Sequence, residues 1–308
     1  MRIAFAGTPE VAVPALEALA ASEHELVAVL TRPDAPLGRK RVLTPSPVAA
    51  RAEELGLHVI RSAKPGEDIV AELRELGVEL GVVVAYGALL RLPMLEAPAH
   101  GWINLHFSLL PKLRGAAPLQ RAVLGGHAET GISIFRLEEG LDTGPVFAQR
   151  AVPIPPEATS GELLAELARD ASGDLLAVVD AIAAGTAVAR PQEGEPTHAP
   201  KLGPADGVVD WTLPAELVHA RIRGATPEPG AASELDGQRL KLHAVRRLEP
   251  GEQAPELAPG EVRMAAKRVY AGTGSEPIRL LRVQPAGKQA MDADAWWRGL
   301  GRDSAVLS

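Results

Sequence analysis

Apolar runs that alternate with helical patterns are the feature that most limits how this chain can fold. Residues 2–7 (RIAFAG), 25–31 (ELVAVLT) and 78–87 (VELGVVVAYG) have the composition of strands, and stretches with helical spacing separate them. The third run is almost wholly apolar, as expected for a strand that is buried on both faces. Alternation of this kind predicts an α/β fold with a doubly wound, mostly parallel sheet.

The pattern changes after residue 187. Residues 190–207 (RPQEGEPTHAPKLGPADG) are rich in proline, glycine and charge, which is typical of a linker. Beyond them, short strand-like runs such as 238–245 (QRLKLHAV) and 278–285 (IRLLRVQP) are separated by glycine and proline, which predicts a small β-barrel or sandwich. We therefore expect a first domain over 1–187, a linker over 188–207 and a second, smaller domain over 208–308.

Composition narrows the possible chemistry and location. The chain has no cysteine, which excludes disulfides and thiolate metal ligands. Its amino-terminal apolar stretch is too short for a signal peptide, and its longest apolar run, Leu80–Leu90, is too short to span a bilayer. We therefore expect a cytoplasmic protein that does not enter the membrane.

Charge is unevenly distributed along the chain. The net charge of −7 argues mildly against a nucleic-acid partner. However, residues 1–207 have 18 Lys and Arg against 26 Asp and Glu, whereas residues 208–308 have 14 against 13. The acidity thus belongs to the first part, and local basic clusters elsewhere can still attract phosphates.

A polar pair marks one predicted strand end. Asn104 and His106 lie two residues apart in INLHFSLLPKLRG (103–115), so both face one side of the strand at its carboxyl end. A solvated face gives the same pattern, and Asp142 in GLDTG is most simply a turn residue. If Asp142 lies beside His106, it holds one imidazole tautomer and favours the protonated form, while Asn104 can donate to a developing oxyanion. Such a group suits acyl-type transfer, and without a Ser or Cys nucleophile motif we favour direct transfer between two substrates.

Three motifs carry a resemblance to a known family. Asn-x-His at 104–106, Ser-Leu-Leu-Pro-x-x-Arg-Gly at 108–115 and Leu-Asp-Thr-Gly at 141–144 resemble the formyltransferase family that uses 10-formyltetrahydrofolate. The likeness extends over nearly the whole chain. It implies a Rossmann-like catalytic domain, an OB-like carboxyl-terminal β-barrel and no metal.

The resemblance also assigns roles to individual residues. It implies that the catalytic residues are Asn104, His106 and Asp142, and that folate contacts Ser108, Leu109, Leu110 and Pro111. Phe107 departs from the family, which commonly has glycine there, and is expected to narrow the folate site slightly.

The same resemblance implies the substrates. The formyl group of 10-formyltetrahydrofolate would pass to the α-amine of methionine esterified to initiator tRNA, for translation initiation. In the loop 31–47, the basic residues Arg39, Lys40 and Arg41 are expected to contact tRNA, although a solvated loop explains their charge equally well. We expect a monomer.

Other functions stay open from the sequence alone. A formyltransferase acting on a sugar nucleotide or glycinamide ribonucleotide, or a formyl-folate hydrolase, would share the first domain without needing a tRNA-binding barrel. A non-catalytic OB-type RNA-binding protein is disfavoured because few aromatic residues are available to stack on bases. A nicotinamide cofactor is disfavoured because Gly7 lacks the further glycines of a dinucleotide fingerprint.

Overall fold

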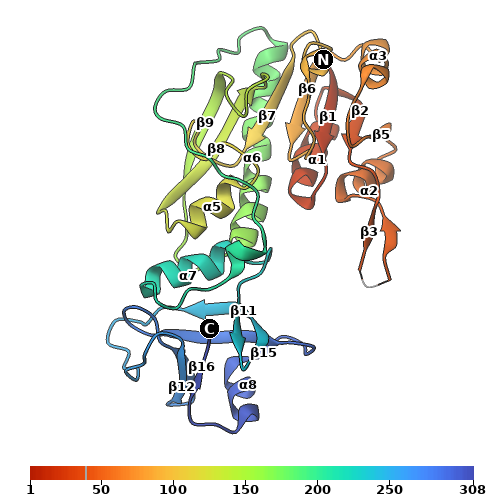
Figure 1. Ribbon diagram of the computed structural model, residues 1–308. Coiled ribbons are helices and arrows are strands. Elements are labelled where there is room, and N and C mark those ends of the chain that lie inside the picture. The colour runs from red at the N-terminus through yellow and green to blue at the C-terminus, as the bar shows by residue number, and fades with distance from the viewer. Residues whose placement is uncertain (39) are drawn as a thin grey trace. The chain divides into compact units, whose positions relative to one another are not determined.

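The chain is divided into two units in the computed structural model, which describes residues 1–38 and 40–308 (Figure 1). The first unit contains Met1–Pro118, Thr130–Val152 and Leu164–Pro200. The second contains Leu119–Glu129, Pro153–Leu163 and Lys201–Ser308. Each unit has a buried apolar core of its own.

A seven-stranded sheet forms the first unit. Its strand order is β5 (Val59–Arg61), β2 (Glu25–Thr31), β1 (Arg2–Gly7), β6 (Leu80–Val84), β7 (Trp102–His106), β8 (Glu129–Arg136) and β9 (Val146–Pro153). The pairs from β5 to β7 are parallel, and β8 runs antiparallel to β7. The predicted α/β fold with a mostly parallel sheet is therefore confirmed.

Helices connect these strands. They are η1 (Glu10–Ala12), α1 (Val13–Ala20), α2 (Pro47–Glu54), α3 (Glu67–Glu75), α4 (Leu92–Leu95), α5 (Pro118–Leu124) and α6 (Ser160–Ala183). The start of α2 is fixed by Ser46, whose Oγ accepts the Ala49 N–H at 3.0 Å, and by a proline at the first helical position. Within residues 1–38 and 40–308, no helix is long and apolar enough to cross a membrane.

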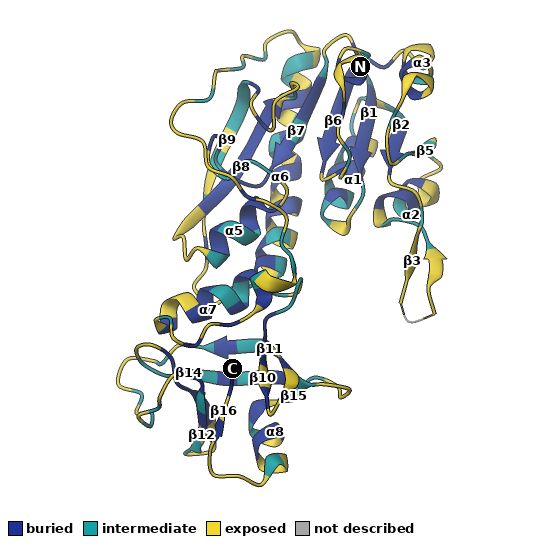
Figure 2. Ribbon diagram, in the orientation of Figure 1, coloured by how far each residue is buried: buried dark blue, intermediate teal, exposed yellow. Residues whose placement is uncertain are grey.

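The central strands are buried, and one glycine fixes how they pack (Figure 2). Gly81 of β6 pairs with Trp102 of β7, and a Cβ at Gly81 would lie 2.1 Å from Trp102 Cδ2. Only glycine leaves room for this indole, whose Nε1 donates to the Met94 carbonyl at 2.6 Å. The amino end of β7 is thus anchored, which fixes where its carboxyl end emerges.

The carboxyl ends of the parallel strands meet where the strand order reverses. From β1 the chain moves out to β2 and β5, and it returns to β6 on the other side of β1. In open α/β sheets such a reversal opens a crevice for ligands. Here Thr8 Oγ1 donates to the Tyr86 carbonyl at 2.8 Å, and Arg32 Nη1 donates to the Gly87 carbonyl at 2.7 Å. These bonds hold together the loops that follow β1, β2 and β6.

A separate antiparallel sheet forms the second unit. Its order is β10 (Ala232–Leu235), β11 (Gln238–Arg246), β14 (Ile278–Pro285), β13 (Arg268–Ala271), β12 (Glu261–Ala265) and β16 (Ala305–Val306), with β15 (Met291–Asp292) beside β14. Helices η2 (Pro204–Gly207), α7 (Ala215–Gly224) and α8 (Ala293–Leu300) accompany it, and Trp211, Trp296 and Trp297 lie in its core. The expected strand-rich carboxyl-terminal part is confirmed as this sheet. An isolated bridge joins Leu235 to Leu307, but the sheet does not close as a continuous barrel in the described residues.

The segment predicted as a basic loop contains a small hairpin instead. β3 (Ala35–Leu37) and β4 (Val42–Thr44) pair as a two-stranded antiparallel sheet. Lys40 and Arg41 are exposed at its turn, while Arg39, predicted to contact tRNA, lies outside the described residues. Val42 and Thr44 are β-branched and suit strands, although the strands are too short to give a clear alternating pattern.

Candidate active site

Asn104 and His106 end β7 at the carboxyl edge of the parallel strands. Asn104 pairs with Val83 of β6 and with Phe135 of β8, and His106 pairs with Ser133. The two-residue period of a strand directs both side chains to the same face, as predicted. His106 is buried and Asn104 is partly buried.

The His106 ring has a defined tautomer. Its Nε2 lies 3.0 Å from the Leu113 carbonyl oxygen, which can only accept a hydrogen bond, so Nε2 carries a proton. Its Nδ1 lies 3.9 Å from Asp142 Oδ2, too far for a direct hydrogen bond but close enough for a strong charge interaction. The Phe135 ring lies perpendicular to the imidazole, with the two ring centroids 6.2 Å apart.

Two opposing effects determine the protonation state of His106. Burial lowers the pKa of His106 below its ordinary 6.5, and this outweighs the Asp142 carboxylate and the Leu113 carbonyl, which both raise it. Asp142 favours the protonated form, as expected from the sequence, but the opposing effect of burial is larger. The protein without substrate therefore favours neutral imidazole. A neutral ring with its proton on Nε2 presents a basic lone pair on Nδ1.

Asp142 is brought beside His106 by a tight turn. Its φ of +52° lies in the left-handed region, and its Oδ2 accepts the Gly115 N–H at 2.7 Å. Gly144 allows the turn to fold back, because a Cβ there would lie 1.8 Å from the Arg136 carbonyl oxygen. The turn thus joins Asp142 to His106 and also to the loop after β7.

The side-chain oxygen of Asn104 has no hydrogen-bond partner within residues 1–38 and 40–308. Asn104 Oδ1 is buried and accepts no hydrogen bond from the residues that the structure describes. An unsatisfied buried acceptor costs about 1–3 kcal/mol, and in native proteins such groups often mark functional positions. An N–H or O–H donor from a bound molecule would satisfy this oxygen.

The loop from Ser108 to Pro111 is fixed by polar side chains that the sequence analysis did not identify. Ser133 Oγ donates to the Ser108 carbonyl at 2.7 Å and accepts the Leu110 N–H at 3.0 Å. Gln149 Nε2 donates to the Leu110 carbonyl at 2.7 Å and to Ser133 Oγ at 2.9 Å. No motif marks Ser133 or Gln149, since strand residues with this spacing usually have no special role.

Folate contacts at Ser108, Leu109, Leu110 and Pro111 stay a prediction from the family resemblance. Ser108, Leu110 and Pro111 are buried, and Leu109 is partly buried. Phe107, which departs from the family pattern, is also buried.

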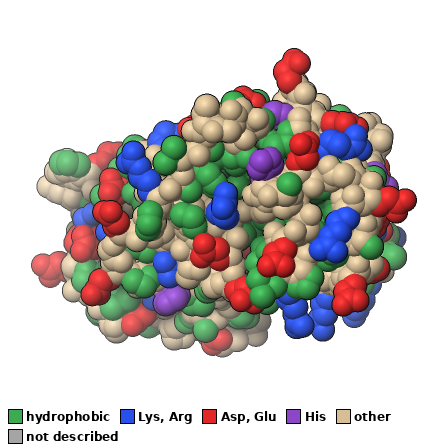
Figure 3. Space-filling model, turned by 90° about the horizontal axis from the view of Figure 1, so that it is seen from above, with side chains coloured by type: hydrophobic (Ala, Val, Ile, Leu, Met, Phe, Trp, Pro, Cys, Tyr) green, Lys and Arg blue, Asp and Glu red, His purple; other side chains and the backbone are tan. Residues whose placement is uncertain are grey.

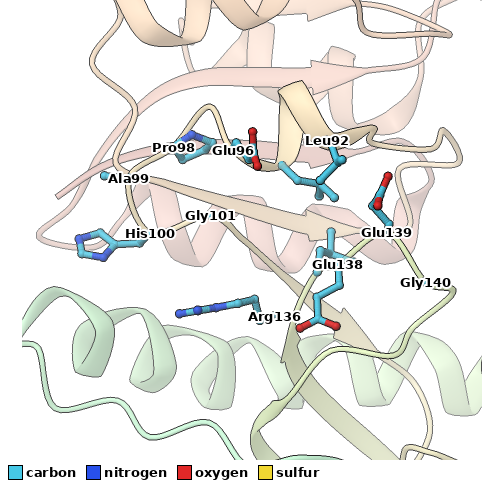
Figure 4. A pocket seen from close by; sticks show the side chains of 12 residues that line it. Leu92, Glu96, Pro98, Ala99, His100, Gly101, Arg136, Glu138, Glu139 and Gly140 are labelled. Atoms are coloured by element: carbon cyan, nitrogen blue, oxygen red, sulfur yellow. The ribbon is translucent and has the colours of Figure 1, made fainter.

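Cavities of about 750, 550 and 450 Å³ lie in the first unit, and two of them have residues close in sequence to the candidate site. The one of about 750 Å³ is lined by Leu92, Glu96, His100, Arg136, Glu138 and neighbours (Figure 4). Its residue Gly101 directly precedes β7, so this cavity lies at the opposite end of that strand from His106. The one of about 450 Å³ is lined by residues that include Leu110, Gln149 and Gln192. This smaller cavity therefore adjoins the loop that holds the candidate site.

Charge on the surface is mixed. Figure 3 shows acidic and basic side chains interspersed over one face of the molecule. In the described part of the chain, no group of three or more His, Cys, Asp or Glu side chains is arranged to hold a metal ion.

Comparisons with known proteins cover both parts of the chain. The formyl transferase family model matches residues 1–179, and the model for the formyl transferase C-terminal domain matches residues 201–301. A methionyl-tRNA formyltransferase from Leifsonia xyli subsp. xyli is 56% identical over 308 residues, which cover 100% of each chain. One from Clavibacter sepedonicus is 55% identical over 300 residues, or 97% of each chain.

A solved structure has the same fold. The N-formyltransferase from Helicobacter canadensis, in complex with folinic acid and dTDP-3-aminofucose, aligns with a TM-score of 0.69 at 17% identity. The alignment covers 92% of this chain and 98% of that one. With family models matched in both parts and more than half of the residues shared with full-length relatives, the chain belongs to the formyltransferase family.

Proposed function

We propose that this protein transfers the formyl group of 10-formyltetrahydrofolate to the α-amino group of methionyl initiator tRNA. One observation carries the proposal: Asn104, His106 and Asp142 lie together in a chain whose full-length relatives are methionyl-tRNA formyltransferases. The reaction breaks the bond from the formyl carbon to N10 of the folate and forms a bond from that carbon to the amine nitrogen.

His106 acts first as a base in this proposal. Its neutral Nδ1 takes a proton from the attacking amine as the tetrahedral intermediate forms. The resulting imidazolium is stabilised by Asp142, whose Oδ2 lies 3.9 Å away, and its other nitrogen keeps its bond to the Leu113 carbonyl. The proton then passes to N10 of the leaving tetrahydrofolate, so the imidazole returns to its neutral form.

Asn104 positions the reacting groups. Its Oδ1 accepts an N–H of the incoming amine, which supplies the partner that this buried oxygen lacks. Its amide N–H donates to the formyl oxygen as negative charge develops there. Ser108, Leu109, Leu110 and Pro111 would contact the folate from a loop that Ser133 and Gln149 hold in place.

The second unit supplies tRNA binding in this proposal, and we infer that it is an OB-like barrel. The bridge between Leu235 and Leu307 supports that form because it links the first and last strands of the sheet. Arg239 and Lys241 share an exposed face of β11, whereas Arg246 and Arg247 form ion pairs with Glu249 and Glu276. The first two cations are therefore better placed to bind phosphates.

The remaining parts of the proposal concern organisation and location. We propose domains over 1–187 and 208–308 with a connecting segment over 188–207, and tRNA contacts at Arg39, Lys40 and Arg41. We further propose a monomer that acts in the cytoplasm, where charged tRNA and folate occur together.

Formylation of purified acceptors tests the function. The protein should formylate methionyl initiator tRNA with 10-formyltetrahydrofolate, and should not transfer formyl to a sugar nucleotide or to glycinamide ribonucleotide. If the protein formylates one of these small amines and gives no product with charged tRNA, the small amine is the substrate and the proposal is wrong. Release of free formate without an acceptor would instead indicate a hydrolase.

A further inference from the structure

Gln192 lies in the segment predicted as a linker, yet its side chain is fully engaged with two loops of the candidate site. Its Nε2 donates to the Asp142 carbonyl at 2.7 Å and to the Gly144 carbonyl at 2.9 Å. Its Oε1 accepts from Arg114 Nη2 at 2.7 Å and from Arg114 Nε at 3.3 Å. Both amide donors and both lone pairs are used, and only one orientation of the amide satisfies all four bonds.

Gln192, Arg114, Gly115 and Asp142 are linked in a ring of contacts. Gln192 accepts from Arg114, the next residue Gly115 donates its N–H to Asp142 Oδ2, and the Asp142 carbonyl accepts from Gln192. The residue before Arg114 is Leu113, whose carbonyl accepts from His106 Nε2. Leu113, Arg114 and Gly115 are thus bonded, in that order, to the His106 imidazole, to Gln192 and to the Asp142 carboxylate.

The predicted linker, residues 188–207, also contacts the loop after β7 through Thr197 and Ala199. Thr197 Oγ1 accepts the Leu113 N–H at 2.8 Å, and the Thr197 carbonyl accepts the Arg114 N–H at 2.8 Å. Ala199 donates its N–H to the Arg114 carbonyl at 2.7 Å. Leu113 has a φ of +59°, so these bonds hold the loop in a conformation that its sequence does not favour.

We propose that Gln192 is a positioning residue that sets the distance between His106 and Asp142 by fastening the Asp142 turn to the loop after β7. This inference rests on the proposed function only where kcat and KM are measured, because those values require formyl transfer to charged tRNA. Asp142 itself occupies a left-handed conformation that costs free energy for a non-glycine residue, and the two bonds from Gln192 add to the Gly115 contact that holds it there. The segment between the domains is, on this account, part of the catalytic centre.

Two substitutions distinguish a Gln192 that joins the Asp142 turn to Arg114 from one that serves only as a partner of Arg114. Gln192→Glu keeps the size and the acceptor for Arg114 but loses both donors to the turn, and Gln192→Ala loses all four bonds. We expect kcat to fall about 10²-fold in each, because small displacements of reacting groups have effects of this size. KM for methionyl tRNA should change by less than about threefold, since binding away from the reacting atoms is kept.

The pKa of His106 gives a readout that mere loss of stability would not change. If Asp142 moves away, His106 loses a carboxylate that raises its pKa, so NMR titration of Gln192→Ala should give a lower value, toward that of Asp142→Asn. Glu195→Ala is the matched control, because Glu195 is an exposed residue of the same segment. That variant should keep both kcat and the histidine pKa.

Each outcome is decisive. Normal kcat in Gln192→Glu together with a loss in Gln192→Ala would show that Gln192 serves only Arg114, and the proposal would be overturned. An unchanged or raised His106 pKa in Gln192→Ala would overturn it as well, and so would an equal loss in the control. If the wild-type protein fails to formylate charged tRNA, the proposed function fails, but the pKa comparison still decides the role of Gln192.

Discussion

Replacing Asp142 by Asn removes one charge from the site with little change in shape. Asn is among the residues that best tolerate a left-handed conformation, which Asp142 adopts with φ +52°. Its amide oxygen can still accept the Gly115 N–H that Asp142 Oδ2 accepts at 2.7 Å. The turn should therefore keep its geometry, and the effect should come from the lost charge.

The size of that effect follows from the distance between the two side chains. Asp142 Oδ2 lies 3.9 Å from His106 Nδ1, and the side chains are only 11% and 6% exposed. An effective dielectric constant of about 20 gives about 4 kcal/mol for unit charges at this separation. The imidazolium of His106 forms together with the tetrahedral intermediate in the proposed reaction. Without the Asp142 charge this imidazolium loses about 4 kcal/mol of stabilisation, which corresponds to about a 10³-fold decrease in the rate of transfer.

Single-turnover formylation of methionyl initiator tRNA measures this loss directly. Glu139→Gln is the matched control, because it removes one charge from an exposed position of the same loop. The control should react at the wild-type rate, and both variants should unfold at similar temperatures. A rate for Asp142→Asn within tenfold of the wild type would refute the argument that this carboxylate stabilises an imidazolium.

Three further predictions concern the site and the hairpin. Asn104→Ala should cost about 3–4 kcal/mol in kcat/KM through the lost oxyanion donor, without lowering the unfolding temperature, because Asn104 Oδ1 has no hydrogen-bond partner among the described residues; activity within tenfold of normal would count against it. His106 should titrate below 6.5 by NMR. The unfolded state then binds the proton more readily than the folded state, so the contribution of His106 to the free energy of unfolding should be lost as pH falls below about 6.5. A pKa at or above that value would contradict the neutral imidazole. Replacing Lys40 and Arg41 together by Ala should weaken tRNA binding and reduce its salt dependence by a slope of about 0.7–0.9 for each lost phosphate contact; an unchanged slope would mean that these side chains do not meet the tRNA.

The sheet and the polar pair were accessible from sequence because both follow simple periods. The run from Leu80 to Val84 is apolar throughout, and the structure buries every residue of that strand. The two-residue spacing of Asn104 and His106 was enough to put them on one face. The placement of Asp142 beside them relied on the family resemblance, since a turn residue in GLDTG has no local signal for its partner.

Other features depend on contacts that residue types do not encode. The charge state of His106 is set by burial among groups from separate segments, Leu113 and Phe135 included. Gln192 binds backbone carbonyls of Asp142 and Gly144, and carbonyls are the same in every residue. A proline- and glycine-rich segment therefore looks like a linker in sequence even where it is hydrogen-bonded to the candidate site.

The central claim is that His106 moves the proton during formyl transfer to methionyl initiator tRNA. Its most direct test is single-turnover formylation by the wild-type protein and by His106→Ala, with saturating 10-formyltetrahydrofolate and charged initiator tRNA. We predict formyl-methionyl-tRNA from the wild type and a rate about 10²–10⁴-fold lower from the variant, which should remain folded. Equal single-turnover rates for the two proteins would contradict it.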